Sequence, residues 1–266
     1  MKPAAFQYRA PATLQEALSV LEANADSAKL LAGGQSLVPV LNFRLATPAL
    51  LVDLNRIDSL AGIREDADGS LVIGAITRHR AVEKSELVRR ANPLLHAAMP
   101  HIAHAQIRNR GTIGGSLSHA DPAAELPAVC LACDASLTIA SRGGERSVSA
   151  AEFFQGFFTT ALKPNEILVS IRFPAWPPGR RFAFLEFSRR HGDFALVGVA
   201  LTVDGEDTRV TVFGAEDVPK RVAVNRKNIA DVAARITPRA DHHASAEYRK
   251  ELVEVLTRRA LEKALT

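Results

Sequence analysis

The sequence predicts a protein of mixed helices and sheets in two parts, the second of which is a small unit with strands before helices. Up to residue 173, helical and strand patterns alternate along the chain. Residues 182–265 instead hold three strand patterns followed by two helical ones. Between the two parts, prolines and a glycine surround Trp176, a composition typical of a linker. We therefore expect one domain over residues 1–176 and another over residues 180–266.

The first part opens with alternating helix and strand signals. Thr13–Glu16 has the spacing of a capping box, and apolar residues follow it at helical intervals. Lys29–Leu31 and Leu50–Leu54 are short apolar runs typical of buried strands, and Ser36–Leu41 fits a short helix. The first of these strands runs into the turn at residues 32–36. This turn therefore lies where α/β sheets tend to bind ligands.

The remaining elements follow from the same two periodicities. In the first part we expect strands over Leu71–Ile76, Ala135–Ala140 and Ile167–Phe173, and helices over Arg80–Arg90 and Pro93–His104. In the second part we expect strands over Phe182–Phe187, Ala195–Val203 and Arg209–Phe213, and helices over Asn225–Ala234 and Ser245–Leu265. Asp204-Gly205 is a hairpin signal between two of these strands.

Composition and charge exclude several classes of protein. Hydrophobic residues make up 47 % of the 266 residues and charged residues 23 %, as in ordinary globular proteins. The formal net charge is +4, and residues 220–266 hold 11 basic and 6 acidic residues. Because aromatic residues are not interleaved with these charges, we interpret this segment as a solvated helix face and expect no nucleic-acid partner. Neither a signal peptide nor a membrane-spanning run is visible, so we expect a cytoplasmic protein.

The sequence lacks the common catalytic motifs. Cys130 and Cys133 form a single CxxC, which is too few ligands for structural zinc, and such low cysteine usage fits a reducing compartment. His101 and His104 lie three apart without further metal ligands, and no HExxH, GxSxG, Walker or GxGxxG motif occurs. We therefore expect no catalytic residue and no metal ligand in this chain, so that a bound cofactor would do the chemistry.

Two glycine-rich turns are the strongest functional signal. Residues 32–36 and residues 112–116 each join paired glycines to a hydroxyl side chain. Glycine lets a ligand approach the backbone closely, and successive N–H groups in a turn can form an anion-binding concavity. Asp121 and Glu125 follow with carboxylates that suit ribityl or ribose hydroxyls. The two turns predict a long phosphate-bearing ligand held at two places, which leaves open a nucleotide-binding module and a cofactor-dependent enzyme.

The segments Ala32–Leu37, Asp53–Arg56 and Arg108–Ser116, in this order, resemble the FAD-binding medium subunit of molybdenum hydroxylases, the xanthine dehydrogenase and carbon monoxide dehydrogenase group. Three further segments extend the resemblance over nearly the whole chain: Phe6–Leu14, Arg189–Ala195 and Ala244–Arg249. The resemblance implies an α+β fold, with a PCMH/VAO-type FAD-binding domain of two subdomains over residues 1–176. Over residues 180–266 it implies a small C-terminal domain, for which the strand patterns predict a three-stranded sheet plus helices.

The resemblance also implies a set of FAD-binding positions. Residues 32–36 and 112–116 would hold the pyrophosphate and neighbouring atoms, and Leu162 and Phe194 would lie near the isoalloxazine ring. Glu125 stands where the family often has Asp. Glu186 stands where some members have Lys, so no contact is assigned to it. The implied FAD-binding residues are Ala32, Gly33, Gly34, Gln35, Ser36, Leu37, Thr112, Ile113, Gly114, Gly115, Ser116, His119, Asp121, Glu125, Leu162 and Phe194.

The function implied by the resemblance is that of an electron-transfer subunit. FAD on this chain would pass electrons from [2Fe–2S] clusters of a small partner subunit to an external acceptor. A large partner with a molybdenum–pterin centre would hydroxylate the substrate, in a dimer of heterotrimers. Two cysteines cannot ligate the clusters, which take four ligands each. The alternatives are a free-standing FAD-dependent oxidoreductase of the same fold and a nucleotide-phosphate binding module without redox chemistry.

Overall fold

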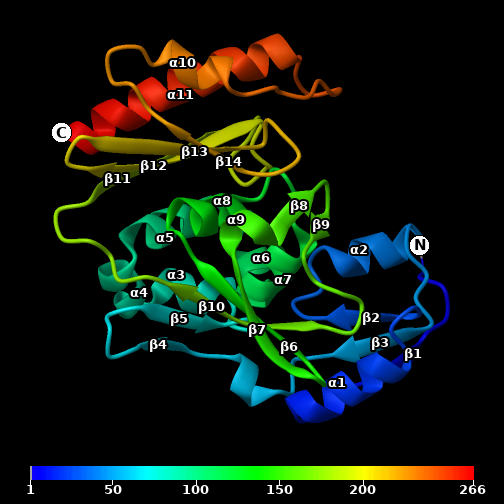
Figure 1. Cartoon of the computed structure of the whole chain (residues 1–266). Helices are drawn as coiled ribbons and strands as arrows, with labels where there is room; N and C mark the ends of the chain where they lie inside the picture. Colours follow the sequence, from blue (N-terminus) through cyan, green and yellow to red (C-terminus); the bar gives the residue numbers. More distant parts are fainter. Residues whose placement is uncertain (1) are drawn as a thin grey trace.

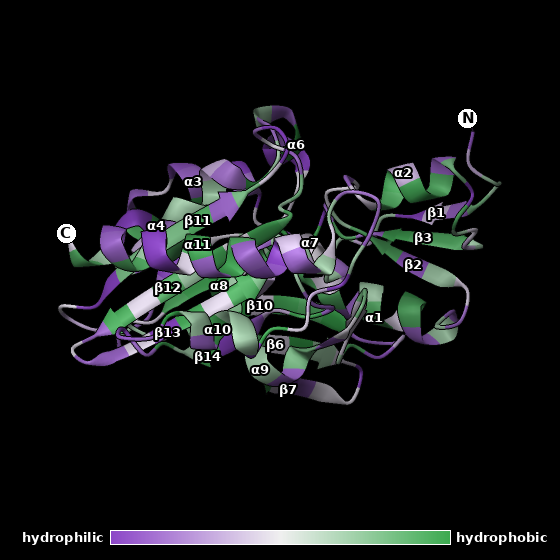
Figure 2. Ribbon diagram, turned by 90° about the horizontal axis from the view of Figure 1, so that it is seen from above, coloured by the Kyte–Doolittle hydropathy of each residue, from purple (hydrophilic) through white to green (hydrophobic). Residues whose placement is uncertain are grey.

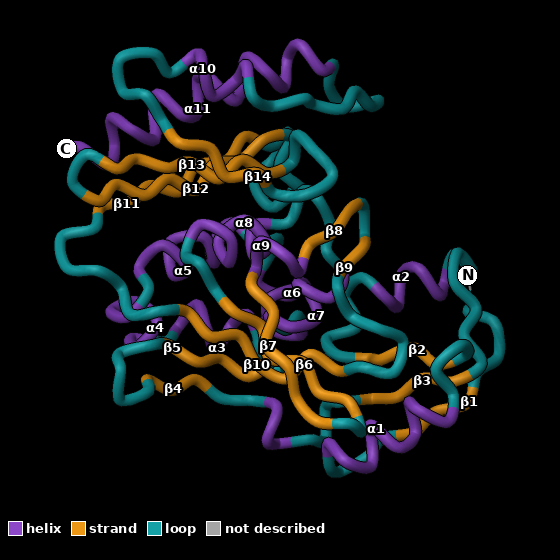
Figure 3. The backbone as a smooth tube through the Cα atoms, viewed as in Figure 1, coloured by secondary structure: helices purple, strands orange, loops and turns teal. Residues whose placement is uncertain are grey.

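The computed structural model describes residues 2–266, which are arranged in layers (Figure 1). A five-stranded sheet and a smaller parallel sheet form one side, and a four-stranded sheet with two helices forms the other. Figure 3 separates strands from helices and shows a layer of helices between the two larger sheets. The protein therefore has the mixed helix and sheet composition that the sequence predicts.

The N-terminal unit is a parallel sheet in the order β1-β3-β2 with two helices. Its elements are β1 (Gln7–Arg9), α1 (Leu14–Ala23), β2 (Ala28–Leu31), α2 (Leu37–Asn42) and β3 (Leu50–Asp53). Thr13 Oγ1 accepts the Glu16 N–H at 3.2 Å, and Glu16 Oε2 accepts the Ala12 N–H at 3.0 Å. The predicted capping box therefore begins α1.

The five-stranded sheet is antiparallel, in the order β4-β5-β10-β6-β7. Its strands are β4 (Ile63–Glu65), β5 (Leu71–Gly74), β6 (Ser136–Ser141), β7 (Gly144–Ser149) and β10 (Ile167–Phe173). Alternate residues such as Ile73, Leu137 and Ile171 are fully buried against the helical layer. Figure 2, which is coloured by hydropathy, shows β10 as largely green, whereas the outer helices α3 and α4 are largely purple.

The helical layer consists of short helices. They are α3 (His79–Lys84), α4 (Glu86–Ala91), α5 (Pro93–Ala98), α6 (Ala105–Arg110), α7 (Ile113–His119), α8 (Glu125–Ala132) and α9 (Ala150–Phe153). Two 3₁₀ turns, η1 (Asp58–Leu60) and η2 (Met99–His101), and a small hairpin, β8 (Phe154–Gly156) with β9 (Thr159–Thr160), complete this part.

Three predicted helices are shorter than the sequence suggests. The helix expected over Asn225–Ala234 begins only at Ala230, and two helices in the first part end early or are interrupted. The expected helix over Arg80–Arg90 is interrupted at Ser85, whose hydroxyl accepts the Val88 N–H at 3.2 Å and begins α4. The expected helix over Pro93–His104 ends at Ala98, and His104 has extended backbone. In both cases the apolar spacing continues while a local polar or backbone preference ends the helix.

The third sheet is antiparallel, with β11 (Arg181–Phe187), β12 (Val197–Asp204), β13 (Asp207–Phe213) and β14 (Lys220–Ala223). Two helices follow it, α10 (Ala230–Ala234) and α11 (Ala246–Leu265). The prediction of three strands here is wrong by one, because β14 is half charged and buries only Val222. β12 is buried from Val197 to Val203, since α11 and α8 both pack against it.

Residues 174–180 join β10 to β11, where the sequence predicts a linker. Phe184 and Phe213 of the third sheet nevertheless lie in the same buried cluster as Leu126 of α8. The two parts thus share a core, and the division into domains stays a proposal. Within residues 2–266, none of the helices has the length and apolar character needed to cross a membrane.

Candidate functional site

A cavity of about 870 Å³ lies between the N-terminal unit, the helices α6–α8 and the loop after β9. Cofactor and ligand sites range over about 300–1,000 Å³. Segments far apart in the sequence contribute to its wall, and every FAD-binding position implied by the sequence lines it except Ile113. Ile113 is fully buried in the core beside the cavity. The fold therefore gathers nearly all of the expected residues around one space.

The first glycine loop, residues 32–36, presents unpaired backbone donors. Within residues 2–266, the N–H groups of Gly33, Gly34, Gln35 and Ser36 form no hydrogen bond. Gly34 has φ +73°, a left-handed conformation that other residues rarely adopt. A run of free N–H groups in a turn is a ready anion site. This loop therefore has the geometry that the sequence predicts for phosphate binding.

Residues of the motif Asp53–Arg56 fix the position of this loop by hydrogen bonds. Asn55 Nδ2 donates to the Ala32 carbonyl at 2.8 Å, and Arg78 Nη2 donates to Asn55 Oδ1 at 2.7 Å. Asp53 accepts the Asn55 N–H at 2.9 Å. The end of β3 thus fixes the position of the first glycine loop, a role that the sequence pattern alone does not indicate.

The second glycine segment differs from the prediction of a turn with free N–H groups. Residues 113–119 are the helix α7, and its first N–H groups already have acceptors. Gly114 N–H donates to the Ala75 carbonyl at 2.8 Å, and Gly115 N–H donates to Thr112 Oγ1 at 3.1 Å. The expected anion-binding concavity is therefore wrong for residues 112–116, and this segment offers the cavity side-chain hydroxyls such as that of Ser116 instead.

Close packing explains the glycines of both segments. A Cβ on Gly114 would lie 2.5 Å from the Ala75 Cβ, and one on Gly33 would lie 2.4 Å from the Arg110 carbonyl oxygen. Real Cβ atoms do not approach other atoms this closely, so the backbone would have to move. Gly33 and Gly114 are therefore required where one chain segment crosses another.

A buried guanidinium shapes one wall of the cavity. Arg108 Nη1 donates to the carbonyls of Ile102 and Ala103, both at 2.9 Å, and its Nε donates to Glu83 at 3.0 Å. Ala103 has φ +45°, and both Ile102 and Ala103 line the cavity. The sequence shows Arg108 only as part of a motif, because its partners lie on η2, on α3 and in the loop before α6.

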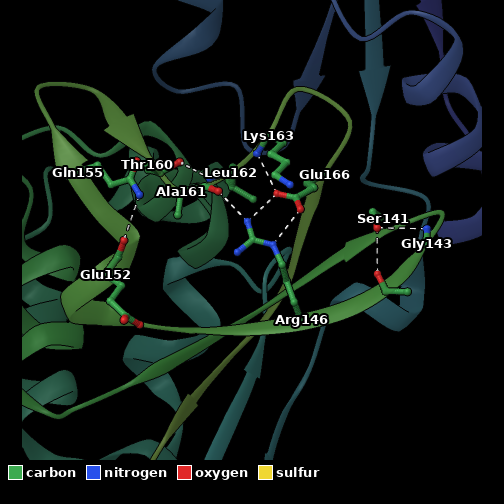
Figure 4. Close-up of polar contacts among 11 residues, drawn as sticks. Ser141, Gly143, Arg146, Glu152, Gln155, Thr160, Ala161, Leu162, Lys163 and Glu166 are labelled. Atoms are coloured by element: carbon green, nitrogen blue, oxygen red, sulfur yellow. Dashed lines mark hydrogen bonds and ion pairs between the residues drawn. The ribbon is translucent and has the colours of Figure 1, made fainter.

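The loop that carries Leu162 is held by an ion pair, shown in Figure 4. Arg146 Nε and Nη2 donate to the two carboxylate oxygens of Glu166, each at 2.8 Å, and Nη2 also donates to the Ala161 carbonyl at 2.7 Å. Glu166 Oε2 in addition accepts the Lys163 N–H at 2.8 Å. The guanidinium lowers the pKa of the Glu166 carboxyl. These bonds set the position of Leu162 in the cavity wall.

Aromatic side chains from three segments surround the mouth of the cavity. Phe194 is 64 % exposed although it lines the cavity. The ring of Phe158 packs against His119 with centroids 4.8 Å apart, and Arg239 lies over the neighbouring Phe157 ring. Burial lowers the pKa of His119. The residues Phe158, His119 and Phe194 thus offer flat apolar faces to a ring system in the cavity.

The two carboxylates that follow the second glycine segment, Asp121 and Glu125, also line the cavity. Asp121 lies in the loop before α8, where its Oδ1 accepts the Ala123 N–H at 2.9 Å. Ala124 is the N-cap of α8, and Glu125 is its first residue. Burial, and next the charge of Glu186, raise the pKa of Glu125 to about 8. Glu125 is therefore largely protonated at neutral pH.

One cavity residue escapes sequence reasoning. His79 is buried, and within the described part of the chain neither of its ring nitrogens has a hydrogen-bond partner. Burial lowers its pKa to about 4, so the ring is neutral at pH 7. A single histidine at the start of a helix does not indicate a buried, neutral cavity residue. The burial of His79 depends on the contact of α3 with the second glycine segment.

Known proteins are similar to this chain in both sequence and fold. Residues 4–176 match the family described as "FAD binding domain in molybdopterin dehydrogenase". The chain is 42 % identical to the 6-hydroxypseudooxynicotine dehydrogenase complex subunit alpha of Paenarthrobacter nicotinovorans, covering 100 % of this chain and 96 % of that protein. It is 37 % identical to the glyceraldehyde dehydrogenase medium chain of Sulfolobus acidocaldarius, with 98 % of each covered. A chain of carbon monoxide dehydrogenase from Hydrogenophaga pseudoflava superposes with a TM-score of 0.94 at 35 % identity, over 100 % of this chain and 99 % of that one.

The fold and the cavity define a flavin-binding oxidoreductase subunit. The chain belongs to the family of FAD-binding medium subunits of molybdenum hydroxylases. This result confirms the family resemblance, the α+β fold with a PCMH-type FAD-binding domain, and the FAD cofactor expected from the sequence.

Proposed function

We propose that this chain is the FAD-carrying electron-transfer subunit of a molybdenum hydroxylase, taking electrons from [2Fe–2S] clusters of a partner and passing them to an external acceptor. The observation that carries the proposal is the run of free N–H groups at Gly33–Ser36 beside a cavity of about 870 Å³. Bound FAD supplies the exchange between one-electron and two-electron steps. The chain itself binds and orients it.

The residues present fit this cofactor. Four free donors at residues 33–36 suit the pyrophosphate, which carries negative charge. The Ser116 hydroxyl can donate to a phosphate oxygen, and the Asp121 carboxylate can accept from sugar hydroxyls. Leu162 and Phe194 offer apolar contacts to the ring. The other implied FAD-binding residues that line the cavity belong to the same proposal, and Ile113 supports α7 from within the core.

The number of cysteines in the chain indicates that the iron–sulfur clusters lie on another subunit. Cys130 and Cys133 are buried in α8 and at its end, and burial raises the pKa of both thiols. A [2Fe–2S] cluster takes four ligands, and the sequence has two cysteines. We therefore place the clusters on a small partner subunit and the molybdenum–pterin centre on a large one, in a cytoplasmic dimer of heterotrimers that does not bind nucleic acid.

The names of the relatives agree with such an assembly. One relative is named a "complex subunit alpha", and others are named medium chains of dehydrogenases. In this assembly, the large subunit selects the substrate. Similar medium chains are therefore expected in complexes that act on different substrates. Within the chain, we also propose that residues 1–176 and 180–266 act as two domains.

The proposal is tested by purifying the affinity-tagged full chain from its natural host. We expect a yellow protein that releases FAD on denaturation and copurifies with one large and one small subunit. FAD without partner subunits would instead favour a free-standing oxidoreductase of the same fold. A folded chain that contains no flavin and takes up none when FAD is added would contradict the proposal.

A further inference from the structure

Three ionisable side chains, those of His101, Glu186 and Glu125, differ in exposure and in their access to the cavity. Glu125 lines the cavity and is 5 % exposed. The side chain of Glu186 on β11 is 6 % exposed and does not line the cavity. His101, at the end of η2, has a side chain that is 36 % exposed, and its Nδ1 lies 3.4 Å from Glu186 Oε1. His101 is thus the most exposed of the three, and Glu125 is the one that reaches the cavity.

These groups lie on three separate elements, η2, β11 and α8. Phe184, two residues before Glu186 on β11, packs into the core with α8, and its ring contacts the His101 ring with centroids 5.0 Å apart. Because side chains two apart on a strand share a face, Glu186 faces the same helical layer. Glu125 begins α8, so its carboxyl lies at the end of that helix nearest the cavity.

The polar atoms of this cluster are incompletely satisfied. Among the residues described, Glu186 Oε2 is buried without a hydrogen-bond partner. A buried carboxylate oxygen without a donor is costly, and a proton shared with a second carboxyl removes that cost. Glu125 is a second buried carboxyl, and burial and the charges of Glu186 and Asp121 raise its pKa to about 8, so it holds a proton at neutral pH.

Other charged groups near α8 are engaged elsewhere or lie on its other sides. Arg221 contacts the C-terminal end of α8, where it donates to the Leu131 carbonyl at 3.0 Å and pairs with Asp134. The further titratable groups on elements that pack against α8 or precede it are His96, His119, Asp121, Glu152, Asp204, Asp207, Arg209 and Lys220. Of all these groups, only Asp121 joins Glu186 in raising the pKa of Glu125.

We propose that His101, Glu186 and Glu125 form a proton path from the surface to the cavity, and that the Glu125 carboxyl exchanges a proton with bound FAD. This inference rests on the proposed function, since it needs FAD in the cavity. In the reducing direction, FAD accepts two electrons from the iron–sulfur partner or another reductant. The Glu125 O–H bond breaks and an N–H bond forms on the flavin ring. The Glu125 carboxylate then takes a proton that His101 draws from water through Glu186. Reoxidation reverses each transfer, and the electron pair leaves to the acceptor.

The path is tested with the FAD-loaded full chain, reduced by dithionite in a stopped-flow instrument at pH 7. With FAD in excess, so that each variant is loaded, we expect E125Q and E186Q to be reduced about a hundredfold more slowly, the lower end of what general acids contribute. H101Q is expected to be slower by several-fold, and added imidazole is expected to restore its rate. H96Q is the matched control, because His96 lies on the adjoining helix α5 outside the path, and it is expected to match the unmodified protein.

The possible results separate this inference from the proposed function. An unmodified chain that binds no FAD would contradict the proposed function and the path with it. FAD-loaded E125Q and E186Q that are reduced at the normal rate would contradict the path alone. Slow reduction of H101Q without rescue by imidazole would also overturn it, because a purely structural defect is not repaired by a small proton carrier.

Discussion

Arg146 and Glu166 form a two-point ion pair in which Nε and Nη2 each donate to one carboxylate oxygen at 2.8 Å. The pair joins β7 to the loop before β10, and the same guanidinium donates to the Ala161 carbonyl. A bidentate arginine–carboxylate pair fixes geometry as well as charge. The position of Leu162 in the cavity wall therefore depends on a residue outside the cavity.

Replacing Arg146 by Met is expected to destabilise this loop. The change leaves the nearly buried Glu166 carboxylate without its main partner, at a cost of about 1–3 kcal/mol in the free energy of unfolding. Urea denaturation measures the loss. R142M is the control, since Arg142 lies exposed at the β6–β7 turn, and a loss of equal size in R142M would contradict the account.

The same pair gives a pH dependence with a definite sign. Arg146 lowers the pKa of Glu166 below its ordinary 4.5, so the stabilisation is present above pH 4.5 and is lost as the pH falls through the lower value. The difference in unfolding free energy between the unmodified chain and R146M should therefore shrink below about pH 4. A difference that stays constant from pH 7 to pH 3 would show that the charge of Glu166 is not involved.

The two glycine segments are expected to respond differently to substitution. Gly34→Ala places a side chain at φ +73°, which costs about 1–2 kcal/mol and distorts the free N–H groups, so FAD affinity should fall at least tenfold. Fluorescence titration with FAD measures the affinity. Gly179→Ala imposes similar strain at φ +77° in open space on the linker, and its FAD affinity should not change.

Gly114→Val, by contrast, is expected to damage the fold itself. The new Cβ would lie 2.5 Å from the Ala75 Cβ, and overpacking of this kind costs about 1–3 kcal/mol or more. A fall of the thermal midpoint in the absence of FAD measures the effect. Gly143→Val at the exposed β6–β7 turn is the control. A normal midpoint for G114V would contradict the packing role.

Because of His79 and Glu125, the free energy of unfolding of the FAD-free chain is expected to be highest at intermediate pH. The pKa of His79 is lowered from 6.5 to about 4, so stability falls as the pH drops from 6.5 to 4, by about 3 kcal/mol. The pKa of Glu125 is raised from 4.5 to about 8, so stability falls as the pH rises from 4.5 to 8, by about 5 kcal/mol. His79→Phe should therefore flatten the acid side and Glu125→Gln the alkaline side. Urea denaturation from pH 4 to pH 9 checks both, and unchanged profiles would contradict the burial of these groups.

The sequence predicts the order of the main elements and the gathering of the site more fully than it predicts local geometry. The free N–H groups of the loop at residues 32–36 agree with the prediction. The sequence indicates them because a strand runs directly into paired glycines there. For residues 112–116 the prediction of free N–H groups is wrong. The acceptor for the Gly114 N–H is the Ala75 carbonyl, which lies far away in the sequence. Strand β14 was missed because its burial depends on pairing with β13 rather than on its own composition.

The supporting residues around the cavity show the same limit. Arg108, Arg146 and Asn55 all act through backbone carbonyls or carboxylates on other elements. Sequence patterns report periodicity and local motifs, whereas these contacts arise only when distant segments meet. The burial of His79 and Glu125 likewise follows from packing between elements, and with it their shifted pKa values.

The central claim is that the free N–H groups of the first glycine loop hold the phosphates of FAD. Amide hydrogen exchange of the full chain, with and without FAD, tests it most directly. We expect peptides covering residues 32–37 to exchange quickly without FAD and to be protected with it, while peptides covering residues 113–117 are protected in both states because their donors are already bonded. FAD binding that leaves residues 32–37 unprotected would contradict the account.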